Sequence, residues 1–185
     1  MTRNGRRTMM MALMLVAALA LTASAAEKKH QAAPKFSLKD VTGATVVLDS
    51  LLVTGPVYIV CWDLPCINCI AELDALLPVY DSLAARGLQV VALSVDKSAD
   101  EARVKGFVKA KKWPYIVLLD PQQKVKSAYG IIIKPTAYLI NTDGKIVYTH
   151  IGYKKGDEKR IKEEFLKWLP EPEPTEDKPG QQEDK

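Results

Sequence analysis

Strongly apolar segments alternate along this chain with amphipathic ones. Residues 56–62 (PVYIVCW) and 88–95 (LQVVALSV) are apolar runs rich in β-branched side chains, a pattern typical of strands covered on both faces. Between them, the pattern predicts a helix over about 66–86 that is closed by Gly87 as its C-cap. The following residues predict a helix, a strand, a short helix, two strands and a terminal helix, at 99–112, 115–120, 121–129, 135–140, 145–151 and 157–169.

Turn signals indicate how the strands connect. Residues 36–48 predict a short hairpin that turns near Thr42 and Gly43, and residues 141–144 (NTDG) predict a second hairpin. Parallel strand–helix–strand units would therefore be followed by an antiparallel hairpin and a helix. The expected fold class is α/β: a three-layer sandwich whose central mixed sheet has helices on both faces, with an N-terminal hairpin extension.

Both ends of the chain differ from this core. Residues 9–21 form an unbroken apolar run behind three arginines, too short to span a bilayer comfortably and typical of a secretory signal. We predict a signal peptide over 1–26, with an uncleaved membrane anchor as the alternative, and a polar linker over 27–33. Residues 170–185 are acidic and rich in proline, which predicts a disordered tail. The remaining domain, 34–169, is long enough for one well-buried core.

Composition and charge exclude several classes of protein. The chain is 48% apolar and 26% charged, which is globular composition. Its formal net charge of +4 includes the arginines of the leader, and the other basic residues are scattered among acids. The sequence therefore lacks the clustered basic residues that are typical of a nucleic-acid-binding protein.

The candidate chemistry lies where the strand ending at Trp62 gives way to a helix. Cys66 and Cys69 stand there three residues apart. The first N–H groups of a helix lack intrahelical partners and the dipole is positive, so a thiolate on Cys66 is stabilised. Cys69 lies one turn deeper, within disulfide reach. We expect Cys66 to attack a substrate disulfide and Cys69 to resolve the mixed disulfide, which leaves Cys66–Cys69 oxidised.

Two other interpretations of the cysteine pair compete with this one. A purely structural bridge would close a tiny loop and would add little stability. A zinc site needs four ligands, and the remaining candidates are only Cys61, His30 and His150, so we expect neither a metal nor an organic cofactor. Strand alternation places Cys61 on the face of Val57 and Ile59, where we expect a buried, inert thiol.

The segment VYIVCWDLPCINCIAEL resembles the active-site region of the thioredoxin superfamily, and it is most similar to the exported TlpA/ResA-like branch of thiol–disulfide oxidoreductases. The likeness continues through GLQVVALSVD and FVKAKKWPYIVLLD to YGIIIKPTAYLINTDGKIVYTHIG, and covers about 34–169. It implies a thioredoxin-like fold. In this family the proline that matches Pro135 is cis and packs against the disulfide, so the resemblance places Pro135 and the backbone of Lys134 at the substrate site.

The resemblance also implies roles for two side chains, Glu72 and Trp62. The family carries a glutamate at the position of Glu72 that is implicated in proton management. Helical geometry places Glu72 at the edge of the buried face. Partial burial would raise the pKa of its carboxyl, so that it could take the proton of Cys69. A boundary glutamate in a surface ion pair is the alternative. Trp62 matches an aromatic beside the site, where we expect it to pack against the cysteines and to contribute to substrate binding. We further expect the Lys134 cation to stabilise the Cys66 thiolate and to favour acidic substrates, unless it extends into water.

The sequence also departs from the family pattern. Pro65 replaces the usual tryptophan, Ile67 and Asn68 separate the cysteines, and Asp74 stands where a helix proline is expected. A proline occurs instead at Pro78, where it should kink the helix. These changes keep the redox pair but leave its reduction potential open.

The resulting hypothesis is a periplasmic or otherwise extracytoplasmic thiol–disulfide oxidoreductase, a monomer acting as a reductase. The resemblance implies proteins with cysteine pairs as substrates, for example apocytochrome c, and recharging by a membrane thiol-electron transporter. The alternatives are a disulfide oxidase or isomerase, a peroxiredoxin-like peroxidase, and a non-catalytic binding module.

Overall fold

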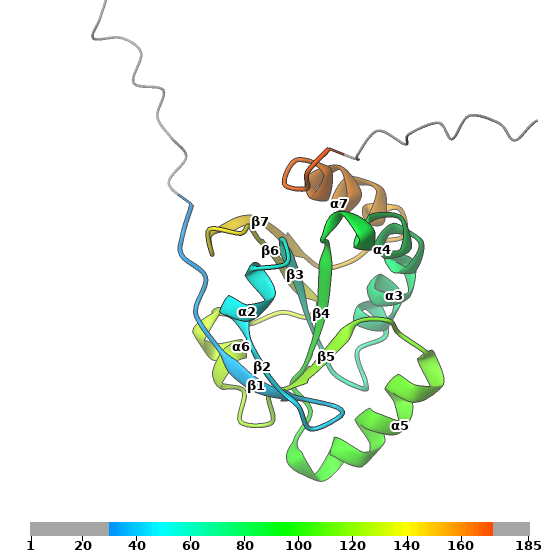
Figure 1. Cartoon of the computed structure of the whole chain (residues 1–185). Coiled ribbons are helices and arrows are strands. Elements are labelled where there is room, and N and C mark those ends of the chain that lie inside the picture. Colours follow the sequence, from blue (N-terminus) through cyan, green and yellow to red (C-terminus); the bar gives the residue numbers. More distant parts are fainter. Residues whose placement is uncertain (1–29, 172–185) are drawn as a thin grey trace, which may run out of the picture. The chain divides into compact units, whose positions relative to one another are not determined.

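The computed structural model describes residues 30–171, so the predicted signal peptide and nearly all of the predicted tail lie outside the described residues. A single mixed sheet runs through this part of the chain, in the order β2-β1-β5-β4-β3-β6-β7 (Figure 1). Strands β3, β4 and β5 are parallel, and the other pairings are antiparallel. The strands are β1 (Ser37–Asp40), β2 (Thr45–Val47), β3 (Val57–Trp62), β4 (Gln89–Ser94), β5 (Ile116–Leu119), β6 (Thr136–Ile140) and β7 (Ile146–Ile151).

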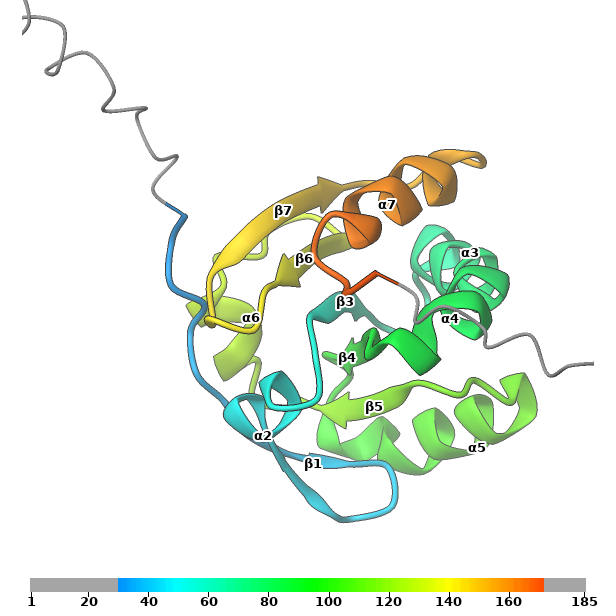
Figure 2. The same cartoon turned by 45° about the horizontal axis from the view of Figure 1, so that its top comes forward.

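Helices cover both faces of the sheet, which agrees with the predicted three-layer sandwich. Helices α3 (Ile67–Ala75), α4 (Leu77–Leu83), α5 (Glu101–Lys111) and α7 (Asp157–Leu166) contribute side chains to one buried cluster. Helices α2 (Leu48–Leu52) and α6 (Lys124–Ala128) contribute to a second cluster on the opposite face. Figure 2 shows α3, α4 and α7 on one side of the strands and α2 and α6 on the other. Two 3-10 helices, Ala84–Arg86 and Ser98–Asp100, complete the helical elements of residues 30–171.

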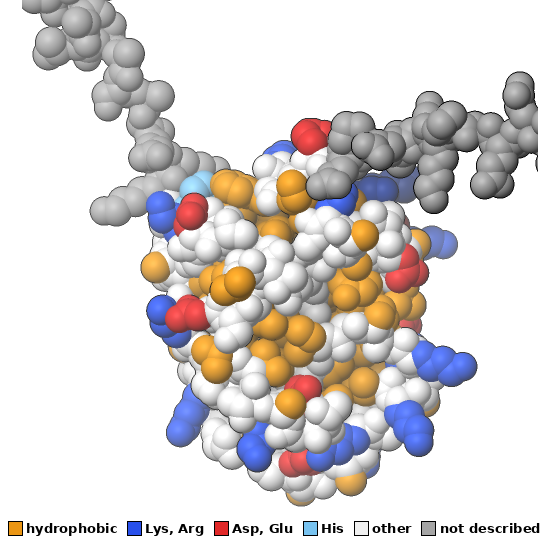
Figure 3. Space-filling view, in the orientation of Figure 1, with side chains coloured by type: hydrophobic (Ala, Val, Ile, Leu, Met, Phe, Trp, Pro, Cys, Tyr) orange, Lys and Arg blue, Asp and Glu red, His pale blue; other side chains and the backbone are white. Residues whose placement is uncertain are grey.

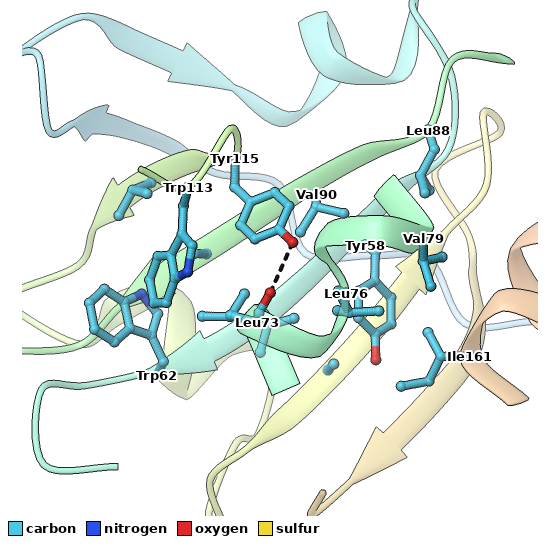
Figure 4. Close-up of a cluster of buried hydrophobic side chains, with 14 of the residues drawn as sticks. Tyr58, Trp62, Leu73, Leu76, Val79, Leu88, Val90, Trp113, Tyr115 and Ile161 are labelled. Atoms are coloured by element: carbon cyan, nitrogen blue, oxygen red, sulfur yellow. Dashed lines mark hydrogen bonds between the residues drawn. The ribbon is translucent and has the colours of Figure 1, made fainter. Parts of the chain in front are cut away.

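The alternation of side chains in β3 divides the two clusters. All six residues of this central strand are buried. Tyr58, Val60 and Trp62 belong to the cluster under α3, whereas Val57, Ile59 and Cys61 belong to the cluster under α2 and α6. Figure 4 shows part of the first cluster, in which the Tyr115 hydroxyl donates a hydrogen bond of 2.9 Å to the Leu73 carbonyl.

The long helix predicted over 66–86 is interrupted near Pro78. Helix α3 ends at Ala75 and α4 begins at Leu77, because a proline has no N–H to continue the helical hydrogen bonds. The end is as predicted: Gly87 caps the final 3-10 turn with a left-handed φ of 93°. Gly55 approaches this cap so closely that a Cβ on it would overlap the Gly87 carbonyl.

Two segments differ from the predictions. Helix α2 was not predicted, since its five residues follow the hairpin directly and are too few to show helical periodicity. Part of the predicted linker is attached to the domain: Ala32 pairs with Lys145, and the Ala33 N–H donates to the Gly144 carbonyl at 2.8 Å. This backbone can pair there because the turn before β7 leaves its polar groups accessible.

The surface adds two observations. On the face shown in Figure 3, lysine and arginine side chains are spread around the periphery with acidic ones among them. Within residues 30–171, no helix is both long and apolar enough to cross a membrane.

Candidate active site

Cys66 and Cys69 form a disulfide at the start of α3. After β3 the chain turns, with the Cys66 N–H donating to the Asp63 carbonyl at 3.0 Å, and Cys66 becomes the N-cap of the helix. The Cys69 N–H points at Cys66 Sγ over 3.3 Å, and the two Cα atoms are 5.3 Å apart. Cys66 is partly exposed, whereas Cys69 is 0% exposed. Only Cys66 can therefore be reached from solvent, and after reduction an N–H donor would face its thiolate.

Asp96 holds the loop that precedes Cys66 through hydrogen bonds. Its carboxylate oxygens accept the Leu64 N–H at 3.1 and 3.2 Å, and the Ser94 hydroxyl donates to it at 2.9 Å. Sequence reasoning missed this residue. The available signal was its position directly after the predicted strand 88–95, at the sheet edge where the cysteine segment also emerges.

The Lys134–Pro135 peptide bond is cis, as the resemblance implied. Cys61 of β3 pairs with Thr136 of β6, so the chain leaving β3 and the chain entering β6 meet at one edge of the sheet. Pro135 is buried, and its carbonyl accepts the Gly152 N–H at 2.7 Å. The segments before β6 and after β7 are thereby held beside the disulfide loop.

Lys134 does not have the free charge that the sequence analysis assumed. Its ammonium group is paired with the Asp63 carboxylate, which lies in the loop between β3 and Cys66. Both side chains are mostly buried, with 26% and 16% exposed. The structure therefore directs the Lys134 ammonium group to Asp63, and the expected effects of Lys134 on the Cys66 thiolate and on acidic substrates stay predictions.

Glu72 lies deeper than helical geometry indicated. It is 0% exposed, and its Oε1 accepts a hydrogen bond of 2.9 Å from the Tyr58 hydroxyl. The burial is complete because α7 packs against the same layer, with Phe165 against the Tyr58 ring at 4.9 Å between centroids. Among residues 30–171, Oε2 has no hydrogen-bond partner. This geometry rules out the surface ion pair considered as an alternative.

The buried environment changes the protonation of Glu72. Burial raises the pKa of its carboxyl to about 8, the Tyr58 hydrogen bond opposes this rise, and the Asp157 carboxylate adds to it. In the disulfide form the group is therefore mostly protonated at neutral pH. It lies three residues beyond Cys69, on the neighbouring turn of α3.

Trp62 and Cys61 are interior residues. Trp62 is 0% exposed and packs against the rings of Trp113 and Phe107, with centroids 5.1 and 5.7 Å away. The expectation that Trp62 binds substrate directly is corrected: it forms part of the floor beneath the site. Cys61 is 0% exposed, and burial raises the pKa of its thiol to about 12.

Asp74 occupies the position of the missing helix proline and fixes the end of α3. Its carboxylate accepts a hydrogen bond of 2.8 Å from Trp113 Nε1 and pairs with Lys111 at 2.6 Å. Sequence reasoning noted the departure but not this tie between α3 and the segment after α5.

His150 is a buried residue of β7. It is 4% exposed, with Nε2 at 3.5 Å from an Asp157 oxygen, and it lines an open pocket of about 460 Å³ together with Asn68 and Arg160. Over residues 30–171, no group of three or more His, Cys, Asp or Glu is arranged to hold a metal ion.

Comparisons with known proteins agree with this geometry. The family model described as the AhpC/TSA family matches residues 30–149. The thiol-disulfide oxidoreductase ResA of Bacillus thuringiensis (strain Al Hakam) is 32% identical over 120 residues, which cover 65% of this chain and 68% of the relative. ResA of Bacillus subtilis (strain 168) is 32% identical over 115 residues, 62% and 63% of the two chains. A solved structure from Chlorobium tepidum, described as a thiol:disulfide interchange protein DsbE, has a TM-score of 0.69 at 27% identity and covers 76% of this chain and 96% of its own.

Proposed function

Since the chain belongs to the AhpC/TSA family and is a protein dithiol–disulfide oxidoreductase, we propose that it acts outside the cytosol as a reductase of protein disulfides. The observation that carries the proposal is the Cys66–Cys69 pair at the start of α3, with one sulfur accessible and the other buried. An accessible thiolate at a helix N-terminus is a good attacking group, and a shielded neighbour is well placed to release the product.

The reaction has two balanced steps. The Cys66 thiolate attacks one sulfur of a client disulfide, so that a Cys66–client bond forms and the other client sulfur leaves as a thiolate. Cys69 then loses its proton and attacks Cys66 Sγ, which expels the second client sulfur as a thiolate. The client disulfide gains two electrons and becomes a dithiol, and the protein becomes the disulfide form.

Glu72 is the proposed base for the second step. Its carboxylate takes the proton of Cys69 as that thiol attacks, and the raised pKa of about 8 in the disulfide form supports its holding this proton at neutral pH. When an electron donor reopens the disulfide, the protonated carboxyl can return the proton to the Cys69 thiolate. The cycle therefore needs no solvent access to Cys69, which is 0% exposed.

The compartment and partners are inferred from the sequence. The apolar run at 9–21 behind three arginines supports export, which would place the cysteines where disulfide chemistry persists. Apocytochrome c, whose cysteines must be reduced before haem attachment, is the proposed client, and a membrane thiol-electron transporter is the proposed donor. Export is tested by purifying the protein from a secreting bacterium: cleavage predicts a mature chain that begins at Ala26 or Glu27, whereas a retained Met1 contradicts it.

Insulin reduction with dithiothreitol tests the activity. We expect the wild type to accelerate precipitation of the insulin B chain, Cys66→Ser to abolish the acceleration, and Cys61→Ala to retain it as the matched control. An inactive wild type would contradict the enzyme and favour a binding module. Hydrogen peroxide consumption faster than insulin reduction would favour a peroxidase.

The direction of electron flow requires the reduction potential. A reductase is expected nearer the roughly −270 mV of thioredoxin than the roughly −120 mV of strongly oxidising enzymes. Equilibration with glutathione or dithiothreitol buffers, followed by thiol trapping, gives this value. A potential near −120 mV would make the protein an oxidase with the same cysteines.

A further inference from the structure

The loop between β3 and α3 carries a charge that the two steps of disulfide exchange do not use. Asp63 directly follows β3, and its carbonyl accepts the Cys66 N–H at 3.0 Å, which closes a turn of four residues. The first and last Cα atoms of such a turn lie within about 7 Å of each other. The Asp63 side chain is 16% exposed, and its Oδ1 has no hydrogen-bond partner among residues 30–171. A mostly buried carboxylate therefore lies close to the residue that carries the attacking sulfur.

Lys134 supplies the opposite charge from a second loop at the same edge of the sheet. Its ammonium group donates to Asp63 Oδ2. The pairing of Cys61 with Thr136 fixes the end of β3 beside the start of β6, so the strands hold both partners in place. Because both side chains are mostly buried, water and salt screen their charges less than they screen those of a surface pair.

The two charges act on the Cys66 thiolate with opposite sign. A carboxylate near a thiol destabilises the thiolate, whereas an ammonium group stabilises it. When the two charges are in contact, these effects largely cancel. The N-terminus of α3, where the Cys69 N–H faces Cys66 Sγ at 3.3 Å, then remains the main source of thiolate stabilisation.

Other ionisable groups surround the start of α3. On the side of β4, Asp63 and Pro65 line an open pocket of about 500 Å³ together with Asp96, Lys97, Asp100 and Arg103. On the side of α7, Asn68 shares its pocket with His150, Lys154, Asp157 and Arg160. Within α3 the titratable groups are Cys69, Glu72 and Asp74. These groups form a background that is the same whether or not residues 63 and 134 are charged.

We propose that Asp63 and Lys134 form a positioning pair for the redox reaction, in which Asp63 weakens the Cys66 thiolate, Lys134 strengthens it, and their contact balances the two effects. The inference rests on the proposed function, in which Cys66 is the attacking thiol, and adds how the reactivity of that thiol is set. A weaker thiolate favours the disulfide form over the dithiol form. Asp63 therefore makes the protein a stronger reductant, and Lys134 makes it a weaker one.

Removing the charges singly and together tests the pair. Asp63→Asn, Lys134→Met and the double variant are reduced, and the pH dependence of the iodoacetamide reaction rate gives the pKa of Cys66. Cys66 is the partly exposed member of the three cysteines, so the reaction reports on this thiol, and peptide mass spectrometry verifies the modified site. We expect Lys134→Met to raise the pKa of Cys66 by about 0.5 or more and Asp63→Asn to lower it by a similar amount. The double variant should keep the wild-type value.

The reduction potential gives a second measurement. It should become less negative in Asp63→Asn and more negative in Lys134→Met, because the first variant stabilises the thiolate of the dithiol form and the second destabilises it. Lys35→Met and Asp49→Asn are the matched controls. These residues form an ion pair of 2.7 Å in the part of the chain that precedes β3, and neither variant should change the potential or the pKa of Cys66.

Opposite changes in the two single variants are the signature of charge, because a loosened loop would change both in the same direction. Changes in the same direction, no change in either single variant, or equal changes in the control pair would overturn the proposal. So would a double variant in which the pKa of Cys66 departs from wild type by about 0.5 or more. Circular dichroism shows which variants fold. If an unpaired charge prevents folding of a single variant, the double variant still tests the proposal.

The titration of Cys66 uses no client protein. An inactive protein, or one with the potential of an oxidase, would contradict the proposed function and leave the outcome of the titration intact. Conversely, a pKa of Cys66 that ignores both charges would overturn the pair and leave the redox activity in place.

Discussion

Replacing Glu72 with glutamine should stabilise the folded protein more strongly as the pH rises. The wild-type carboxyl is 0% exposed, and burial raises its pKa to about 8, compared with an ordinary value of 4.5. The folded state therefore binds this proton more tightly than the unfolded state does. The contribution of the Glu72 carboxyl to the free energy of unfolding is fully present below pH 4.5, decreases above that pH, and is lost once the pH has risen through 8. Glutamine does not titrate, so the variant has no such loss.

The size of the effect follows from the two pKa values. Each pH unit between them changes the free energy of unfolding by about 1.4 kcal/mol. Relative to wild type, Glu72→Gln should therefore gain about 3 kcal/mol between pH 4.5 and pH 7, and about 5 kcal/mol by pH 9, as an order of magnitude. The Tyr58 hydroxyl can still donate to the amide oxygen of glutamine, so that hydrogen bond need not contribute to the pH dependence.

Urea unfolding of the oxidised proteins, followed by circular dichroism at pH 5, 6, 7, 8 and 9, measures the difference directly. The disulfide keeps Cys66 and Cys69 from titrating. Subtracting the free energy of unfolding of the wild type from that of the variant at each pH removes the contributions of most other titrating groups. Glu163→Gln, which changes an exposed glutamate of α7, is the control and should give a difference that stays flat across this range. A flat difference for Glu72→Gln as well would refute the reasoning, because Glu72 would then ionise equally in the folded and unfolded chains.

Three further predictions concern neighbouring features. Tyr58→Phe removes the hydrogen bond that favours ionised Glu72, so the pKa of Glu72 should rise by about one unit or more, seen as a shift of the unfolding profile to higher pH. Because Cys61 is buried with a pKa of about 12, mass spectrometry after iodoacetamide treatment of the native, reduced protein at pH 8 should find it unmodified; alkylation without unfolding would contradict this. Gly55→Ala should cost about 1–3 kcal/mol in urea unfolding, because its Cβ overlaps a backbone carbonyl, whereas Gly106→Ala within α5 has open space and should stabilise by up to about 1 kcal/mol.

Features that depend on local sequence could be predicted. The apolar run of β3 predicted both the strand and the opposite faces on which Val60 and Cys61 lie, because alternation is a property of the strand alone. The placement of Cys66 at a helix N-terminus and the interruption at Pro78 also follow from short segments. The resemblance added the cis bond before Pro135, which composition and periodicity do not indicate.

Features that depend on distant contacts could not be predicted. Lys134 meets Asp63 across 71 residues of sequence, and Asp96 holds the Leu64 N–H across 32. Helical geometry placed Glu72 at a boundary because it considers only one stripe of α3, whereas Tyr58 of β3 bonds to Glu72 and Phe165 of α7 packs against the Tyr58 ring. No pattern in a single sequence specifies which charges pair or which helix completes a buried layer.

The aromatic floor beneath the disulfide gives the protein an intrinsic optical reporter. Trp62 and Trp113 share one buried cluster with Cys69, and Cys66 packs against the same cluster. A disulfide quenches a nearby excited indole more strongly than two thiols do. Opening the bond should therefore brighten tryptophan emission, so that electron transfer to and from this molecule can be followed in real time without a dye.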